Sequence, residues 1–263
     1  MRQIMLATLK GIFRDRIFYG ILIAGLIVLS IPSVSTLSMR QVPELAVTLA
    51  LSCSSFMLLL LTTFLGGTVL WKDIERRYTY STLTLPISRS SYLLGKFFGV
   101  IVFMLLCALF LSVITVAVIK MVTLTFHPDR PVLWANILAA VAFDALKYML
   151  LTSFAFLFST FSTSFFLPIF GTIAVFLVGS ASQEVFEFVT ASTTQSVSPF
   201  VKTIASALYY ILPNFSAFDL KVYAIYSLEM SSKTAFFTVG YWIVYLTINL
   251  SIATIVFSKR EIK

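Results

Sequence analysis

Charged residues are scarce in this sequence. Of its 263 residues, 19 are Lys or Arg and 11 are Asp or Glu, so that only 11% carry charge. Soluble domains average about 25% charged residues. Hydrophobic residues make up 59% of the chain, against roughly 45–50% in soluble domains. The shortage of charge therefore excludes a soluble globular fold and indicates a membrane protein.

The residues that catalysis and metal binding require are also scarce. The one histidine, His127, lies in "FHPDRP", where two prolines favour a turn residue over a ligand or base. Cys53 and Cys107 both lie in apolar runs and suggest neither a disulfide framework nor a metal site. The sequence has no HExxH, CxxC or GxSxG motif. We therefore expect no enzyme active site, no metal site and no cofactor in this chain.

Nucleotide binding is excluded by the residues of "SSYLLGKFF", which superficially resembles the end of a P-loop. That motif requires Gly at the position of Ser90 and Ser or Thr at the position of Phe97. The net charge of +8 does not indicate a nucleic-acid partner either, because the basic residues lie at span ends and form no soluble basic face. We expect anionic lipids of the cytoplasmic leaflet and a cytoplasmic protein as partners.

Long continuous apolar runs are what the sequence does contain. About 20 helical residues cross a hydrocarbon core of about 30 Å, and runs without alternation predict helices and not barrel strands. The sequence predicts an all-α membrane protein with six spans, formed by Ile17–Leu37, Leu45–Trp71, Phe97–Ile119, Val132–Phe161, Phe165–Ala181 and Thr234–Phe257.

The distribution of basic residues predicts the orientation. With six spans, both termini share one side of the membrane with twelve Lys and Arg residues, and the other side holds six. The positive-inside rule makes the termini cytoplasmic, in the inner or plasma membrane. Residues 1–16 form a basic amphipathic leader, for which we expect an interfacial helix. A cleaved signal peptide is the alternative, which the long basic leader and the later spans disfavour.

Residues 182–233 form the predicted outside segment between spans five and six. Within it, Pro199–Leu212 is apolar but only about 14 residues long, the length of a re-entrant or interfacial helix. If it spanned the membrane, the basic tail "KREIK" would lie outside, against the positive-inside count. We therefore predict a re-entrant segment, with an interfacial one as the alternative.

The fourth predicted span contains two charged residues. Asp144 and Lys147 are three residues apart on one helical face, and Asn136 lies roughly on the same side. Charges at membrane depth are costly, so they should pair and face protein or a water-filled cavity. Two interpretations remain: a neutralising pair that fixes helix packing, or a polar patch along a substrate path.

The loop from Lys72 to Lys96, "KDIERRYTYSTLTLPISRSSYLLGK", is the most informative segment. It concentrates acidic, basic and aromatic residues between two apolar spans. An orientation signal needs only a few basic residues, whereas Tyr and Arg are enriched at protein interfaces. The loop therefore predicts a docking surface on the cytoplasmic side.

This loop resembles the cytoplasmic loop between spans two and three of ABC-2-type transporter permeases. It is similar to the branch that reads roughly E-R-R-x-x-Y-x-x-L-x-x-P-[VI]-S-R-x-x-Y-L-L-G-K, which is associated with copper-enzyme maturation. Tyr78 stands where Thr or Gly is more usual. The matching residues are Glu75, Arg76, Arg77, Tyr80, Leu83, Pro86, Ile87, Ser88, Arg89, Tyr92, Leu93, Leu94, Gly95 and Lys96.

The resemblance implies one ABC-2-type transmembrane domain over residues 1–263, whose loop is a coupling helix for a separate ATPase. The working unit would hold two ATPase subunits, which bind ATP and Mg, and two permease chains, expected to be a homodimer. The ATPase-coupling residues would be Glu75, Arg76, Arg77, Tyr80, Pro86, Ser88 and Arg89. The implied function is an exporter permease. A non-transporting subunit that transmits ATPase motion to an external assembly or maturation partner is the alternative.

Overall fold

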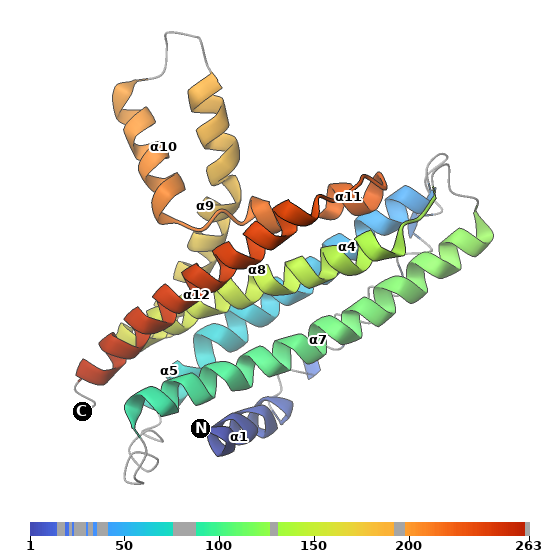
Figure 1. The fold of residues 1–263 in the computed structure, drawn as a ribbon. Helices are drawn as coiled ribbons and strands as arrows, with labels where there is room; N and C mark the ends of the chain where they lie inside the picture. The colour runs from blue at the N-terminus through green and yellow to red at the C-terminus, as the bar shows by residue number, and fades with distance from the viewer. Residues whose placement is uncertain are drawn as a thin grey trace.

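The computed structural model of the chain is a bundle of long helices (Figure 1). It describes residues 1–14, 19–20, 23, 30, 34–35, 42–75, 88–126, 131–191 and 198–260. In these ranges there is no strand, and five helices are long and apolar enough to cross a membrane. The prediction of an all-α, multi-pass membrane protein is confirmed. The first predicted span, Ile17–Leu37, falls mostly outside the described residues and stays a prediction.

The described residues form ten helical elements and one π-helical segment, and Figure 1 labels the α-helices among them. They are α1 (Arg2–Phe13), α4 (Val42–Leu61), the π-helical η2 (Thr62–Gly66), α5 (Gly67–Glu75), α7 (Arg89–Thr125), α8 (Trp134–Phe161), α9 (Phe166–Ala191), α10 (Pro199–Ile211), the 3₁₀ turn η3 (Ser216–Phe218), α11 (Lys221–Ile225) and α12 (Ser232–Lys259).

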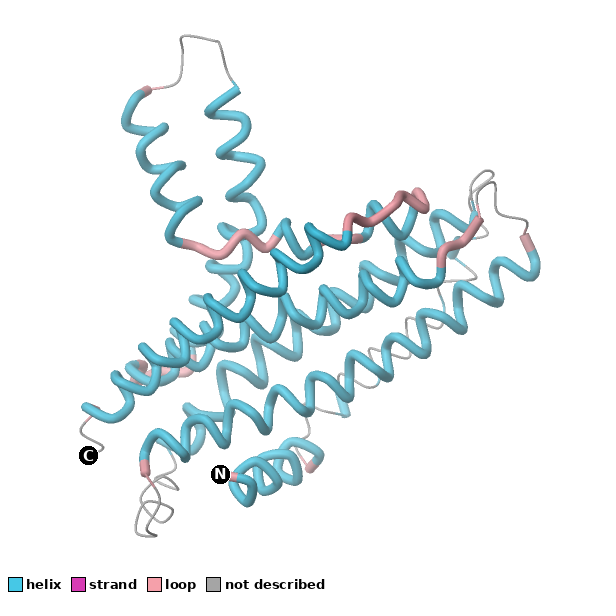
Figure 2. The backbone as a smooth tube through the Cα atoms, in the orientation of Figure 1, coloured by secondary structure: helices cyan, strands magenta, loops and turns pink. Residues whose placement is uncertain are grey.

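The bundle has two distinct ends. Both chain termini, α1, the end of α5 and the start of α7 lie at one end, which we call the terminal end (Figures 1 and 2). The start of α4, the end of α7 and α11 lie at the opposite end, which we call the far end. Helix α7 has 37 residues and is therefore about 55 Å long, which exceeds a hydrocarbon core of about 30 Å. Part of this helix thus extends beyond the apolar layer.

Helix α8 is the centre of the bundle. It contacts α4, α5, α7, α9, α11 and α12, and most of its residues are buried. Hydrogen bonds between helices accompany the apolar packing: Trp242 Nε1 donates to Leu146 O at 2.8 Å, and Asn249 Nδ2 donates to Ser153 Oγ at 3.1 Å. Such bonds are typical of helix contacts in membranes, where apolar burial alone gives little driving force.

The second predicted span, Leu45–Trp71, is a continuous helical segment from Val42 to Glu75 that contains the π-helical turn η2. This turn packs closely on α8, because a Cβ on Gly66 would lie 3.2 Å from Ala155 Cβ. Ser159 Oγ donates to Gly67 O at 3.1 Å. The irregular turn therefore coincides with a close approach of this span to the central helix.

The fifth span differs from its prediction. Helix α9 continues to Ala191, ten residues beyond the predicted end at Ala181. The segment Pro199–Leu212 is helical as α10, ending at Ile211, and it packs against α9 with the rings of Phe186 and Tyr209 4.3 Å apart. Helix α10 and the later part of α9 form a hairpin that stands away from the other long helices (Figure 2). Residues 182–191 are therefore part of a helix and not a loop, because their apolar positions find a partner in α10.

The segment after this hairpin returns to the core. Phe215 and Phe218 are 1% and 0% exposed, and both belong to the main apolar cluster. The sequence predicts the opposite, because Pro213 and the neighbouring polar residues favour a polar surface segment, and this prediction is wrong for Phe215 and Phe218. The junction with α9 is tight: Phe215 N donates to Gly179 O at 3.1 Å.

Helix α1 is docked on α7. Its buried residues are Ile4, Thr8 and Ile12, and they face two glycines of α7: a Cβ on Gly95 would lie 3.0 Å from Ile4 Cβ, and one on Gly99 would lie 2.8 Å from Thr8 Cβ. The predicted amphipathic helix of residues 1–16 is thus present over Arg2–Phe13, with a protein-bound face in addition to its exposed basic one.

Candidate functional site

The base of the loop between α5 and α7 is held by contacts across it. Tyr92 OH on α7 donates a 2.6 Å hydrogen bond to Asp73 Oδ2 on α5, and Lys96 forms an ion pair with the same carboxylate. The side chains of Asp73 and Lys96 are each only 17% exposed. The chain therefore leaves α5 and enters α7 at two points fixed relative to each other.

Three of the predicted ATPase-coupling residues lie in the described part of the chain. Glu75 is the last residue of α5. Ser88 is the N-cap of α7, where its Oγ accepts a 3.2 Å hydrogen bond from Ser91 N, as Ser commonly does at this position. Arg89 is the first residue of α7. The other four, Arg76, Arg77, Tyr80 and Pro86, lie outside the described residues.

Arg89 is bound within the chain. Its Nη1 donates to Ser258 O at 3.0 Å and to Arg260 O at 2.9 Å. Both carbonyl groups belong to the end of α12, where no further helical N–H is available to them. The start of α7 is therefore tied to the end of α12.

Arg260 makes a second contact of the same type. Its guanidinium donates to Thr160 O at 2.7 Å, Ser162 O at 2.9 Å and Ser159 O at 3.3 Å, all at the end of α8. Burial lowers the pKa of Arg260 from its ordinary value. Sequence reasoning counted this residue only as part of the basic tail, and no sequence pattern indicates that α8 is its partner.

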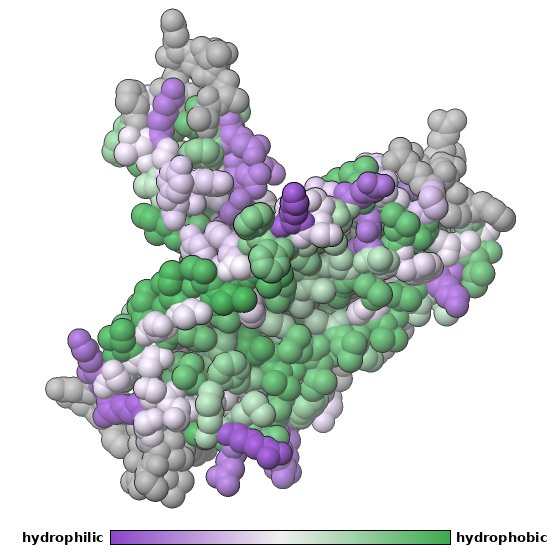
Figure 3. Space-filling model, in the orientation of Figure 1, coloured by the Kyte–Doolittle hydropathy of each residue, from purple (hydrophilic) through white to green (hydrophobic). Residues whose placement is uncertain are grey.

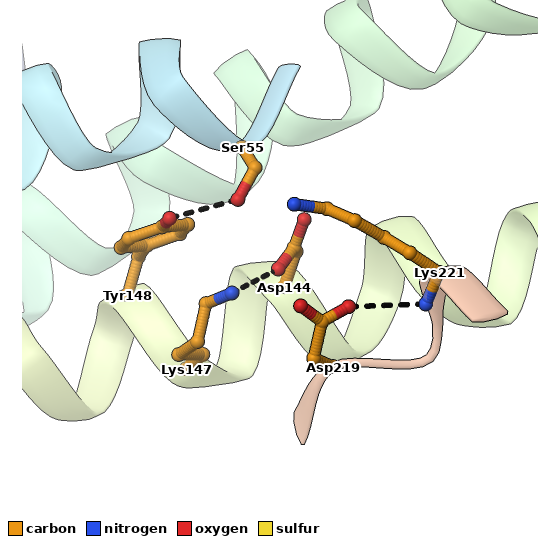
Figure 4. A network of polar contacts seen from close by, with 6 residues as sticks. All are labelled: Ser55, Asp144, Lys147, Tyr148, Asp219 and Lys221. Atoms are coloured by element: carbon orange, nitrogen blue, oxygen red, sulfur yellow. Dashed lines mark hydrogen bonds and ion pairs between the residues drawn. The ribbon is translucent and has the colours of Figure 1, made fainter. Parts of the chain in front are cut away.

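The two charged residues of the fourth span form a buried ion pair. Asp144 and Lys147 are 4% and 5% exposed, and Lys147 Nζ donates to Asp144 Oδ1. Lys147 Nζ also lies 4.8 Å from the centre of the Tyr148 ring, and Tyr148 OH is 2.8 Å from Ser55 Oγ on α4. The pairing expected for charges at membrane depth is therefore present, within a polar network inside the bundle (Figure 4).

The start of α11 and the residues just before it bring two further charged residues to this network. Lys221 N donates to Asp219 Oδ1 at 3.1 Å, and the Lys221 side chain points toward the Asp144 carboxylate (Figure 4). Sequence reasoning did not connect these residues with Asp144, because they are about 75 positions later in the chain. Only the folding of this segment onto α8 brings the two acidic and two basic residues together.

Asn136 has different partners from Asp144 and Lys147, beside which it was predicted to lie. Its Nδ2 donates to Tyr223 O at 3.0 Å and to Leu228 O at 2.9 Å. Both hydrogens of the amide are thus committed to the backbone around α11. The structure gives Asn136 a role in attaching this segment to α8, and it does not place the residue beside Asp144 and Lys147.

Three sizeable grooves are among those on the described surface. One of about 440 Å³ lies between α10 and α12 and is lined by tyrosines that include Tyr209, Tyr241 and Tyr245. Grooves of about 360 Å³ on α7 and α8 and of about 270 Å³ on α9 and α10 are almost entirely apolar. None of the three is lined by Asn136, Asp144 or Lys147. The assignment of these residues to a substrate path stays a prediction.

Metal chemistry has no evident site among the described residues, in which no three His, Cys, Asp or Glu side chains are grouped to hold an ion. Comparisons with protein-family models and with curated proteins found no match to this chain. The family resemblance therefore rests on the residues of the loop, and the geometry around that loop is independent information.

Proposed function

We propose that this chain is the transmembrane permease subunit of an ATP-binding-cassette exporter. In this proposal, a separate cytoplasmic ATPase binds ATP and Mg, and its motion acts on the loop between α5 and α7. Two copies of the chain and two of the ATPase form the complex, in the inner or plasma membrane. The rigid spans convert the motion of the loop into movement of a substrate across or out of the membrane.

The observation that carries the proposal is the construction of the loop base. A loop that only sets orientation needs basic residues and no defined geometry. Here Asp73 contacts both Tyr92 and Lys96, and Arg89 contacts the end of α12. A loop through which force passes requires such fixed ends, because flexible attachments would absorb the displacement. The geometry supports the role that the loop motif suggests.

The placement of charge supports the proposed orientation. Figure 3 shows an apolar surface along the bundle with hydrophilic residues toward its ends. The terminal end holds most of the described Lys and Arg residues outside the apolar layer, namely Arg2, Lys10, Arg14, Lys72, Arg89, Lys96, Lys259 and Arg260. By the positive-inside rule this end faces the cytoplasm, where an ATPase can reach the loop.

Purification of the tagged chain from its own cells in a mild detergent tests the proposal. We expect an ABC-type ATPase, recognised by its own nucleotide-binding motifs, to co-purify with vanadate-sensitive ATP hydrolysis. Replacing Glu75, Arg76 and Arg77 with Ala should abolish both the co-purification of the ATPase and the ATP hydrolysis. Surface changes usually shift stability by at most about 0.5 kcal/mol each, whereas truncating buried interfacial charge pairs costs about 2–5 kcal/mol of binding.

The matched control replaces three charged residues at the same end that lie outside the loop: Lys10, Arg14 and Lys259, all exposed. Arg260 is unsuitable as a control because it holds the end of α8. If the loop variant retained full co-purification and full hydrolysis, the coupling role would be wrong and the loop would serve only orientation.

One observation favours the alternative of a non-transporting subunit that moves an external partner. The hairpin of α9 and α10 is larger than expected and exposes apolar side chains, with Phe188 at 70% and Phe200 at 71% exposure. A photo-reactive residue at either position distinguishes the two functions in living cells. Adducts with lipid or a second copy of the chain fit the permease, whereas an adduct with one exported protein, formed only while ATP is present, fits the alternative.

A further inference from the structure

Two arginines at the terminal end bind the ends of helices that are distant in sequence. Arg89, at the start of α7, donates to Ser258 O and Arg260 O at the end of α12. Arg260 in turn donates to Ser159 O, Thr160 O and Ser162 O at the end of α8. The two contacts share Arg260, whose carbonyl accepts from Arg89 and whose side chain reaches α8.

Guanidinium groups suit this position for two reasons. The last turn of a helix has carbonyl groups without intrahelical partners and the negative end of the helix dipole, and both favour a nearby cation. A guanidinium also presents several N–H donors in a rigid fork, so that it can bind two or three carbonyl oxygens at once, which a lysine ammonium does with less defined geometry. Each arginine thus holds one helix end at a fixed position.

We propose that Arg89 and Arg260 form a relay that makes the ends of α7, α12 and α8 move together. A displacement of the start of α7 is transmitted through Arg89 to the backbone of Arg260, and through the Arg260 side chain to α8. The relay ends on the helix that carries the buried pair Asp144 and Lys147. Both arginines are positioning residues. The part of this inference that concerns ATP-driven motion rests on the proposed function.

The relay differs from two independent helix caps in one measurable way. Independent caps would each stabilise only the helix that they contact. In a relay, loss of Arg89 also loosens the end of α8, although the guanidinium of Arg89 donates to carbonyl groups at the end of α12. In the relay this effect passes through Arg260, because this residue holds the carbonyl bonds to the end of α8.

Hydrogen exchange of the purified full-length chain in lipid nanodiscs tests this difference. With Arg260→Ala we expect amide exchange in the last turn of α8 to rise roughly tenfold or more, as loss of charge-assisted hydrogen bonds implies. Arg89→Ala should accelerate exchange in the last turns of both α12 and α8. In the double variant, amide exchange in the last turn of α8 should be as fast as in Arg260→Ala and no faster, since the two changes interrupt the same path.

Lys259→Ala is the matched control. Lys259 is exposed, adjoins Arg260 and carries the same charge, so its loss should leave exchange at α8 unchanged. If Arg89→Ala accelerated exchange only in α12, the two arginines would be separate caps and the relay would be refuted. Should Arg89→Ala fail to fold, amide exchange in Arg89→Lys tests the same point, because this change keeps the positive charge and removes the guanidinium group.

A second measurement connects the relay with the proposed function. In the complex with the ATPase, Arg260→Lys should leave co-purification intact and reduce vanadate-sensitive hydrolysis severalfold, whereas Lys259→Arg should change neither. Unchanged hydrolysis would show that the helix ends need not move together during the cycle. Absence of any ATPase from the wild-type preparation would refute the proposed function instead, and the exchange experiment would still decide whether the relay exists.

Discussion

At the scale of single residues, the buried ion pair of Asp144 and Lys147 is costly to disturb. Both side chains are almost fully buried in α8, and each neutralises the other. Removing one partner leaves the network of two acidic and two basic residues with an unbalanced charge, whereas removing both keeps the remaining charges balanced. The two single changes and the double change therefore have different expected effects.

We predict that Asp144→Ala destabilises the protein by about 3–5 kcal/mol, and that adding Lys147→Ala restores much of this loss. Thermal unfolding of the purified variants measures both effects. Glu184→Ala, which removes an exposed acid on α9, is the control and should change little. If Asp144→Ala left the unfolding temperature unchanged, the pair would be solvated in the membrane, and neither of its two interpretations would hold.

At the scale of helices, two of the contacts that depend on glycine can be tested separately. The first joins α1 to α7, where Gly99 lies against Thr8 and Met5 O. We predict that Gly99→Val weakens the docking of α1, because overpacking of this kind costs about 1–3 kcal/mol. Faster proteolysis within α1 reports the change. Gly11→Ala is the control: its new methyl group would have no atom within 4 Å, and Ala favours the helix by up to about 1 kcal/mol.

The second contact joins the hairpin to the bundle. A Cβ on Gly179 would lie 2.6 Å from Phe215 Cδ2 and 2.7 Å from Pro213 O, a backbone atom that cannot easily move. Gly179→Ala should therefore displace the segment that carries Phe215 and lower the unfolding temperature. Gly240→Ala on α12, where nothing lies within 4 Å, should not. Equal unfolding temperatures for the two variants would contradict the close approach at this junction.

At the scale of the whole molecule, the orientation in the membrane is open to a direct test. After replacement of Cys53 and Cys107, single cysteines are placed at Thr125 and Ser231 at the far end and at Thr163 at the terminal end, all exposed positions. In intact cells we predict that an impermeant thiol reagent labels the first two and reaches Thr163 only after permeabilisation. Labelling of Thr163 in intact cells would reverse the orientation.

The sequence by itself determined the class of the protein and the position of most spans. Apolar runs of membrane length are a local property of the chain, and helices satisfy their own backbone hydrogen bonds, so five of the six predicted spans reappear in the structure without knowledge of tertiary contacts. The same holds for the pairing of Asp144 with Lys147, which are one helical turn apart. The N-cap of α7 is also a local contact, because Ser88 Oγ accepts its hydrogen bond from Ser91 N, three positions later.

The tertiary structure alone decided the contacts between distant segments. The sequence did not predict that α9 extends to Ala191, because the apolar positions beyond Ala181 are stable as helix only against α10. Nor did it predict that Asn136 binds the backbone around α11, or that Arg89 and Arg260 join three helix ends. Carbonyl groups at helix ends have no signature in the sequence, since every residue type supplies them. Their partners are known only once the helices are placed side by side.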